Sequence, residues 1–192
     1  MGISLKVLIE DTGSEHQALG KEHGLSVYVE TPQSRFVFDC GASGLSWRNA
    51  LLMGVKLTRV EFVVISHAHY DHAGGFPSLL ERVKIRRLYT GPGFWEEKFA
   101  AAPEGRKYTY LGAGFTASDL QDWQVEQNIC EDLLPLDDTA WLVGAFVRQE
   151  PMETIPARFV RGEEKRPDDF RDEICLVLRE GDAVALITGC AH

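Results

Sequence analysis

Three of the six histidines in this sequence fall within the six residues His67-Ala68-His69-Tyr70-Asp71-His72. Neutral imidazoles and a carboxylate are ligands that Zn, Fe and Mn accept in proteins, with Zn–N distances of about 2.0–2.1 Å. Asp71 and His72 are adjacent, so they cannot both join His67 and His69 at one small ion without strain. The spacing therefore predicts two divalent ions, zinc or else iron or manganese, about 3.5–4 Å apart.

A pair of such ions predicts hydrolytic chemistry, because it lowers the pKa of a shared water and stabilises the oxyanion that forms. Asp71 is the candidate catalytic residue, since it can both bind metal and orient the attacking water. His23 and Tyr70 are candidate substrate-binding residues that would donate a proton to the leaving group. We therefore expect a metal-dependent hydrolase that uses a metal-activated water on a phosphoester or ester-type small molecule.

These side chains need an element that points them at one place. On a helix, residues 67 and 69 would diverge by about 200°, whereas in an extended segment they lie on one side. The apolar run 62–65 precedes the motif, so we expect a loop at the exit of a buried strand. Upstream and just downstream, strands and helices alternate. We expect strands at 5–10, 25–31, 35–39, 62–66 and 85–89, and helices at 47–53 and 76–83.

The second half of the chain is less regular. Residues 94–122 mix aromatic, glycine and charged residues, which is typical of an irregular insertion or lid. Residues 161–173 are highly charged and must form a solvated loop or lie near a cation. Strands are expected at 140–147, 174–178 and 183–188, with a tight turn between the last two. The whole chain, residues 1–192, then reads as one α/β (α+β) domain.

The H-x-H-x-D-H motif after a strand resembles the signature of the metallo-β-lactamase fold superfamily. The resemblance implies a four-layer αββα sandwich with a metal site at one edge. It assigns His67 and His69 to one ion, and Asp71 and His72 to the other. Further segments, 23–26, 36–41 and 188–192, resemble in order the subfamily of 7,8-dihydropterin-6-methyl-4-(β-D-ribofuranosyl)aminobenzene 5'-phosphate synthase.

The same resemblance suggests roles for three more residues. Asp39 would lie near the metals and hold the histidine segment by hydrogen bonds, which orients the ligands. His192 resembles a late metal-site histidine, and Cys190 stands where other branches carry a bridging Asp or a Cys ligand. Which of these two binds metal is left open.

Two features depart from the family pattern. Where the superfamily places a third-motif histidine, this chain has Asp168, Asp169 and Asp172. Each is a weak candidate ligand, and a solvated loop is the favoured interpretation. The chain also stops at His192, whereas relatives continue to a Gly-Gly-x-His segment that supplies another ligand. We therefore expect a sandwich that is incomplete at its C-terminus, in a truncated and inactive form or with its site completed by a partner subunit in a homodimer.

Charge and composition limit the classes of partner that this protein can be expected to bind. Acidic residues outnumber basic ones 29 to 20, and the net charge of −9 disfavours nucleic acid as a partner. No apolar stretch reaches the roughly 18 residues of a membrane span, and no signal peptide is recognisable. We expect a cytoplasmic protein with a small-molecule substrate. Two alternatives stay open: a pterin-linked phosphoribosyl-aminobenzene synthase-like enzyme, and an inactive scaffold that binds metal or a partner.

Overall fold

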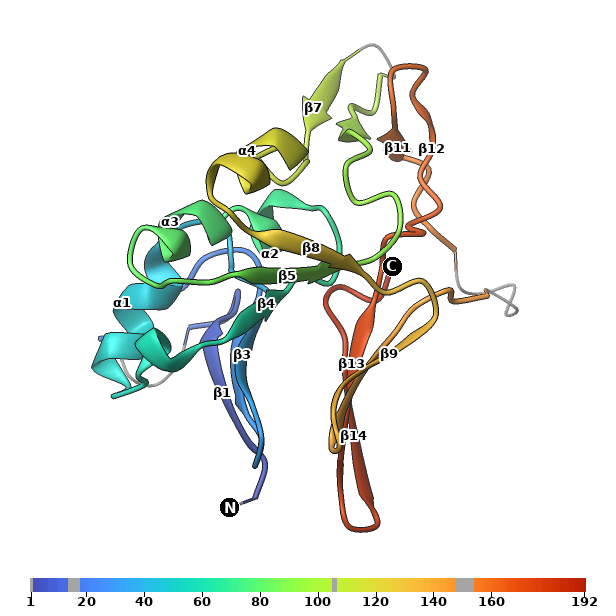
Figure 1. Ribbon diagram of the computed structural model, residues 1–192. Helices are drawn as coiled ribbons and strands as arrows, with labels where there is room; N and C mark the ends of the chain where they lie inside the picture. Colours follow the sequence, from blue (N-terminus) through green and yellow to red (C-terminus); the bar gives the residue numbers. More distant parts are fainter. Residues whose placement is uncertain (1, 14–17, 105–106, 148–153) are drawn as a thin grey trace.

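A six-stranded sheet forms the centre of the computed structural model, which describes residues 2–13, 18–104, 107–147 and 154–192 (Figure 1). Its strand order is β1-β2-β3-β4-β5-β8. The first three strands are antiparallel, and β3, β4, β5 and β8 run parallel. The strands are β1 (Ser4–Ile9), β2 (Ser26–Glu30), β3 (Arg35–Phe38), β4 (Phe62–Val64), β5 (Arg87–Thr90) and β8 (Glu126–Ile129).

The helices lie on one face of this sheet, as Figure 1 shows. Side chains that alternate along each strand cover both faces, so Tyr28, Val37 and Val63 pack into the core under the helices. Phe76 of α3 and Leu120 of α4 belong to the same core. The helical elements are α1 (Leu45–Leu52), the 3₁₀ turn η1 (Leu57–Arg59), α2 (Tyr70–Ala73), α3 (Phe76–Leu80) and α4 (Ala117–Asp122).

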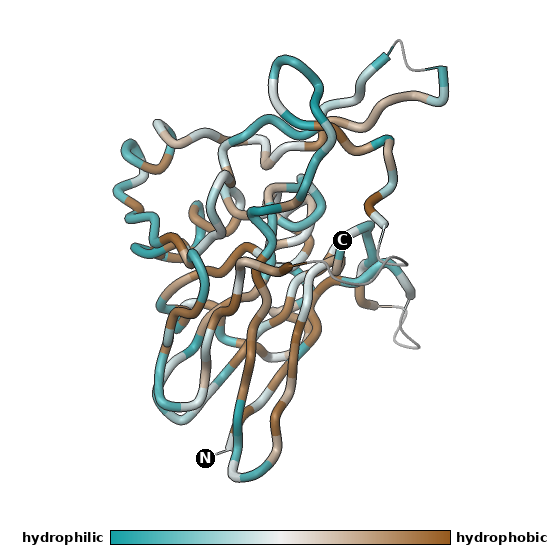
Figure 2. The backbone as a smooth tube through the Cα atoms, turned by 90° about the vertical axis from the view of Figure 1, so that its right-hand side faces the viewer, coloured by the Kyte–Doolittle hydropathy of each residue, from teal (hydrophilic) through white to brown (hydrophobic). Residues whose placement is uncertain are grey.

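A second sheet, in the order β14-β13-β10-β9, packs on the opposite face of the first. Phe36, Val64 and Tyr89 from the first sheet meet Leu142 and Leu176 from the second in a separate core. Figure 2 shows strands with long hydrophobic runs and hairpin tips that are hydrophilic. The strands of the second sheet are β9 (Leu133–Asp137), β10 (Ala140–Val143), β13 (Cys175–Glu180) and β14 (Ala183–Ile187).

The expected α/β class is confirmed by this layered arrangement of helices and sheets. Helices, first sheet and second sheet supply three layers of the expected αββα sandwich. In the part of the chain that the structure describes, no helix lies on the outer face of the second sheet. No described helix is long and apolar enough to cross a membrane.

A third sheet, in the order β12-β11-β6-β7, was not expected from the sequence. Much of the predicted irregular segment 94–122 forms regular elements: β6, β7 and α4. A capping box between Thr116 and Asp119 starts α4, which is a signal that sequence reasoning overlooked. The strands of the third sheet are β6 (Lys98–Ala101), β7 (Tyr108–Tyr110), β11 (Phe159–Arg161) and β12 (Arg166–Pro167).

Candidate metal centre

The histidine loop, residues 65–72, follows β4 and carries four predicted ligands. His67 lies in the expected loop, and His69 is the residue before α2. Asp71 and His72 lie in the single turn of α2, so the loop is shorter than expected. All four side chains are buried. The local fold therefore directs both pairs of candidate ligands inward from one short segment.

Asp39, at the end of β3, holds this loop as the resemblance implied. One carboxylate oxygen accepts a hydrogen bond from the Ser66 amide at 2.7 Å. The other lies 2.8 Å from the Ser66 hydroxyl, which donates to it, and 2.6 Å from His72 Nδ1. Ser66 Oγ is also 3.0 Å from His67 Nδ1. Because these contacts use Nδ1, the Nε2 atoms of both rings are left to face the site.

The imidazole rings converge on one another. The ring centre of His67 lies 4.6 Å from that of His69 and 4.3 Å from that of His72. His192 joins them, with its ring centre 5.2 Å from His67 and 5.3 Å from His69. The Nε2 atoms of His67 and His69 are buried and have no hydrogen-bond partner among the described residues. Buried nitrogens of this kind require a partner, and a divalent metal fits the donor set.

Cys190 is shared by two potential metal-binding groups. Ligand atoms of His67, Cys190 and His192 lie within 4.8 Å of one another, as do those of Asp71, His72 and Cys190. The Cys190 sulfur is 3.1 Å from His72 Nε2. Both residues left open by the sequence are therefore at the site, and the geometry allows both to bind. The groups differ from the implied assignment, because His69 stands beside the first group but is not part of it.

Gly189 brings the Cys190–His192 segment close to the network around Asp39. A Cβ atom at Gly189 would lie 2.2 Å from the Ser66 hydroxyl, so a larger residue would push the segment away. The His192 amide donates to Glu173 Oε1 at 3.0 Å.

Burial sets the charge states of the site. Burial lowers the pKa of His67 well below its usual range, and burial with the neighbouring His192 lowers that of His69 to about 3. Burial likewise lowers the pKa of His192 to about 4. These rings are neutral at pH 7, as metal ligands must be. Burial opposes the charge of His72, but Asp39 raises its pKa to about 12, so a metal that binds His72 Nε2 would have to displace a proton from it.

Of the two predicted substrate-binding residues, His23 contacts a candidate ligand. Its Nε2 lies 3.4 Å from Asp71 Oδ2, and its Nδ1 lies 3.3 Å from Asp11 Oδ2. Gly24 permits this approach, because it has a φ of +124° and a Cβ there would lie 1.9 Å from the Asp71 carbonyl oxygen. The His23 side chain is 67% exposed, so it stands between the site and solvent. Tyr70 is 41% exposed, and its amide is fixed by the Leu111 carbonyl.

Two aromatic residues line one side of the candidate metal centre, and neither was predicted from the sequence. The Phe170 ring stacks on His192 with centres 4.1 Å apart and meets His69 edge-on at 5.3 Å. Phe159, from β11, lies 5.6 Å from His69 and 5.3 Å from His192. Both phenylalanines are buried. No spacing in the sequence pointed to them, because they approach from a distant segment.

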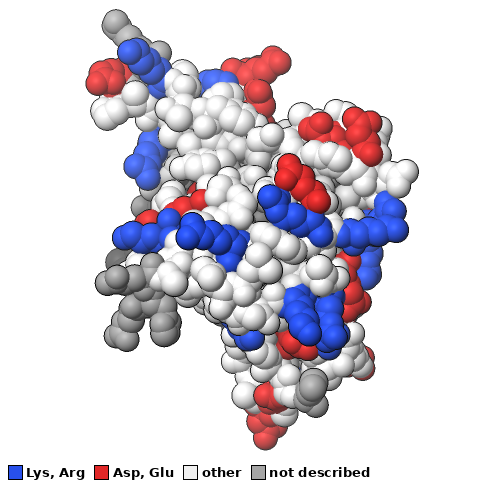
Figure 3. Space-filling model, turned by 90° about the vertical axis from the view of Figure 1, so that its left-hand side faces the viewer, with Lys and Arg blue, Asp and Glu red and all other residues white. Residues whose placement is uncertain are grey.

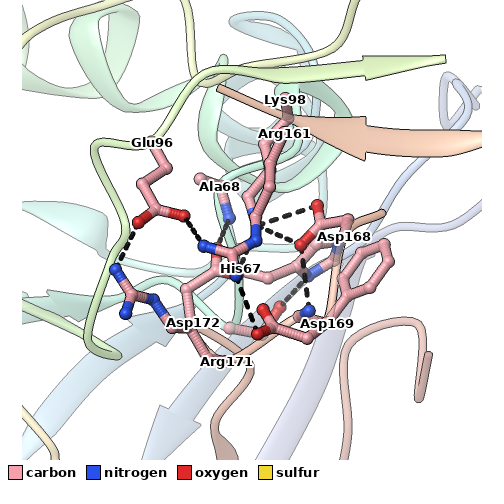
Figure 4. Close-up of polar contacts among 11 residues, drawn as sticks. His67, Ala68, Glu96, Lys98, Arg161, Asp168, Asp169, Arg171 and Asp172 are labelled. Carbon is pink, nitrogen blue, oxygen red and sulfur yellow. Dashed lines mark hydrogen bonds and ion pairs between the residues drawn. The ribbon is translucent and has the colours of Figure 1, made fainter. Parts of the chain in front are cut away.

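The preference for a solvated loop at residues 168–172 is wrong for two of its three aspartates. Asp168 and Asp172 are buried, and both pair with the buried Lys98 of β6 (Figure 4). Asp169 is exposed and pairs with Arg161 at 2.9 Å. Burial raises the pKa of Asp172, and Lys98 opposes that rise. The charged run lies near a cation, which was the other expected possibility.

The chain is similar to several known proteins. The family model of the Metallo-beta-lactamase superfamily matches residues 19–127. An uncharacterized protein of Methanocaldococcus jannaschii is 23% identical over 189 residues, which cover 98% of this chain and 69% of that protein. The same organism's 7,8-dihydropterin-6-methyl-4-(beta-D-ribofuranosyl)-aminobenzene-5'-phosphate synthase is 22% identical, covering 99% of this chain and 68% of its own. A solved metal-dependent hydrolase of the β-lactamase superfamily gives a TM-score of 0.73 at 25% identity.

The chain belongs to the metallo-β-lactamase superfamily, because the family model matches more than half of it. The expected fold family is thereby confirmed, and one relative carries the name of the expected subfamily. The superfamily consists generally of hydrolytic enzymes that bind divalent metals. The match to the solved hydrolase covers 96% of this chain but only 64% of the hydrolase, so this chain spans about two thirds of that protein's length.

Proposed function

We propose that this protein is a metal-dependent hydrolase that cleaves a phosphoester or ester bond in a small molecule. The observation that carries the proposal is the pair of buried Nε2 atoms of His67 and His69, which lack a hydrogen-bond partner among the described residues, beside the two groups of ligand atoms that share Cys190. The proposed ligands are His67, His69, Asp71, His72, Cys190 and His192, for two ions of zinc, iron or manganese. When bound, such ions acidify water and stabilise negative charge on a substrate.

The chain's own residues supply proton transfer. Burial raises the pKa of Asp71, but His72 outweighs it and holds that pKa below its usual range, so Asp71 is ionised and can accept a hydrogen bond from the attacking water. His23 touches Asp71 on one side and Asp11 on the other, which makes a path from the buried carboxylate to solvent. We expect Tyr70, which is 41% exposed, to contact a substrate that enters at this rim. The buried rings of Phe159 and Phe170 pack against His69 and His192 and would keep water from that part of the site.

A small-molecule substrate is favoured over nucleic acid by the net charge of −9. On the face that Figure 3 shows, basic side chains are interspersed with acidic ones. A homodimer and a cytoplasmic location stay predictions from the sequence.

The direct test is hydrolysis of two chromogenic substrates, bis(p-nitrophenyl) phosphate and p-nitrophenyl acetate. Protein treated with chelator and then reloaded with Zn, Mn or Fe should cleave at least one of them. Asp71→Ala should lower turnover by about 10²–10⁴-fold. Asp122→Ala, which changes an exposed carboxylate at the end of α4, should leave it unchanged. Metal-independent turnover, or equal turnover in Asp71→Ala, would contradict the proposal.

A synthase is the second candidate, and the relative with that name supports it over 99% of this chain. The test supplies a 7,8-dihydropterin that carries a diphosphate leaving group on its 6-methyl carbon, together with a ribofuranosyl-aminobenzene phosphate. Mass spectrometry then detects the compound in the relative's name, which forms when the amine nitrogen displaces the diphosphate. If this product forms, depends on Asp71 and is not accompanied by hydrolysis of either chromogenic substrate, the synthase replaces the hydrolase as the proposed function. Metal binding with neither activity would favour a non-catalytic scaffold.

A further inference from the structure

A buried charge cluster, which we call the lysine cluster, lies behind the histidine loop and consists of Lys98, Asp168 and Asp172 (Figure 4). Lys98 Nζ is 2.7 Å from Asp172 Oδ1 and 2.9 Å from Asp168 Oδ2. Each of the three residues is at most 3% exposed. Buried charges are costly unless they are paired and hydrogen-bonded, so this arrangement is a specific feature of the site.

Asp172 uses its second oxygen on the histidine loop. Asp172 Oδ2 accepts a hydrogen bond of 2.8 Å from the Ala68 amide, the peptide nitrogen between the two candidate ligands His67 and His69. A fixed peptide at this position sets the directions in which both imidazole side chains leave the backbone. Asp39 fixes the preceding Ser66 amide from the other side, so the loop is held at two neighbouring positions.

Asp168 connects the same lysine to the aromatic wall. Asp168 Oδ1 accepts a hydrogen bond of 2.9 Å from the Phe170 amide. Phe170 has a φ of +50°, a conformation that costs energy for a phenylalanine and needs support from its surroundings. Its ring stacks on His192, and Lys98 Nζ lies 5.2 Å from the ring centre. Lys98 therefore supports groups on two sides of the candidate centre.

The lysine is the group that allows two carboxylates to be buried together. Two buried anions repel each other, and Lys98 lies between them as a shared counter-ion. It comes from β6 of the third sheet, so it also ties that sheet to the histidine loop.

We propose that Lys98 and Asp172 are positioning residues of the metal centre, which hold the Ala68 peptide and thereby the two flanking histidines in place. This inference rests on the proposed function, because it assigns the two residues a role at that metal site. Neither residue needs to touch metal or substrate. Their contribution is to keep the ligands in one arrangement before metal binds, as supporting groups in metal sites do.

The first test measures zinc affinity by competition with a chromophoric chelator. Asp172→Asn keeps the shape but loses the charge, and Lys98→Met keeps most of the length but loses the ammonium. Both variants should bind zinc about 10–100-fold more weakly than the wild type. Asp169→Asn is the matched control, because it removes an exposed carboxylate from the same loop, and it should bind as the wild type does.

The second test measures hydrogen exchange of the Ala68 amide in zinc-free protein, and so does not depend on a metal. Exchange at Ala68 should be faster in both variants. The Ile65 amide, which donates to the Tyr89 carbonyl at 2.9 Å, should exchange as in the wild type. A loss of general stability alone would accelerate both amides equally, and that result would overturn the positioning role.

Folded variants with wild-type zinc affinity and slow Ala68 exchange would also overturn the proposal. If Lys98→Met does not fold, Asp172→Asn decides, because its amide replaces the carboxylate without a change of size. If the wild type binds no zinc, the proposed metal centre fails, and Ala68 exchange still decides whether Asp172 and Lys98 position the loop.

Discussion

Asp39 and Ser66 hold the histidine loop in a buried hydrogen-bond network, whereas the Cys190–His192 segment follows β14, whose side chains are largely exposed. The loop is thus fixed before metal binds. Contacts of the second segment include one backbone hydrogen bond to Glu173 and the stack of His192 on Phe170. One side of the centre is therefore preorganised, while the other depends more on metal binding to hold it.

The largest effect should follow the loss of a ligand from the preorganised side. In His67→Ala, metal-dependent hydrolysis should fall to the background of the chelated protein, because a buried ligand is lost from the centre of the cluster. Circular dichroism should show an intact fold. Turnover equal to that of the wild type, in protein free of contaminating phosphatase, would show that the preorganised histidine loop does not hold a catalytic metal.

Asp39→Asn should come next, because it weakens the network without removing a ligand. Leaving His72 without its buried partner should lower the free energy of unfolding by about 3–5 kcal/mol. Zinc affinity should fall about 10–100-fold. Urea denaturation and competition titration measure the two effects. Asp137→Asn, which changes an aspartate bonded to Thr31 and Ser34 far from the loop, should lower stability but not zinc affinity.

Acid should destabilise the zinc-free protein through His69. Its folded pKa of about 3 lies below the ordinary value of 6.5, so the unfolded chain takes up the proton first as pH falls. The contribution is therefore present above pH 6.5 and is lost as pH falls towards 3. Between pH 7.5 and 5 it amounts to about 2 kcal/mol.

The difference between the wild type and His69→Gln isolates this contribution, because the raised pKa of His72 acts in the opposite direction. Urea denaturation at pH 7.5 and 5 measures it. An equal loss of stability in both proteins would show that His69 is not held in its neutral form by burial.

The smallest effect on stability should follow a substitution in the Cys190–His192 segment. Cys190 is exposed, so Cys190→Ser should change the free energy of unfolding by at most about 0.5 kcal/mol. Zinc affinity should fall about tenfold, since thiolate is a stronger zinc ligand than a hydroxyl. A stability loss as large as that of Asp39→Asn would show that the two sides are preorganised alike.

The sequence was sufficient to predict five of the six strands of the first sheet and the histidine loop, because these depend on local patterns, but it did not predict β8. Apolar alternation marks β2, β3 and β4, and the histidine spacing requires an extended segment at the exit of β4. The third sheet could not be predicted, because β6 pairs with β11 across about sixty residues. The burial of Asp172 likewise depends on Lys98, which lies 74 positions earlier in the chain.

Metal content tests the central claim most directly. The 192-residue chain is purified without chelator and without a metal-binding tag, and bound metal is measured by elemental analysis. The two groups of ligand atoms that share Cys190 predict about two ions per chain. His67→Ala, purified in the same way, should hold fewer. A wild-type chain that contains no bound metal, even after dialysis against zinc, would contradict the claim that these residues form a metal centre.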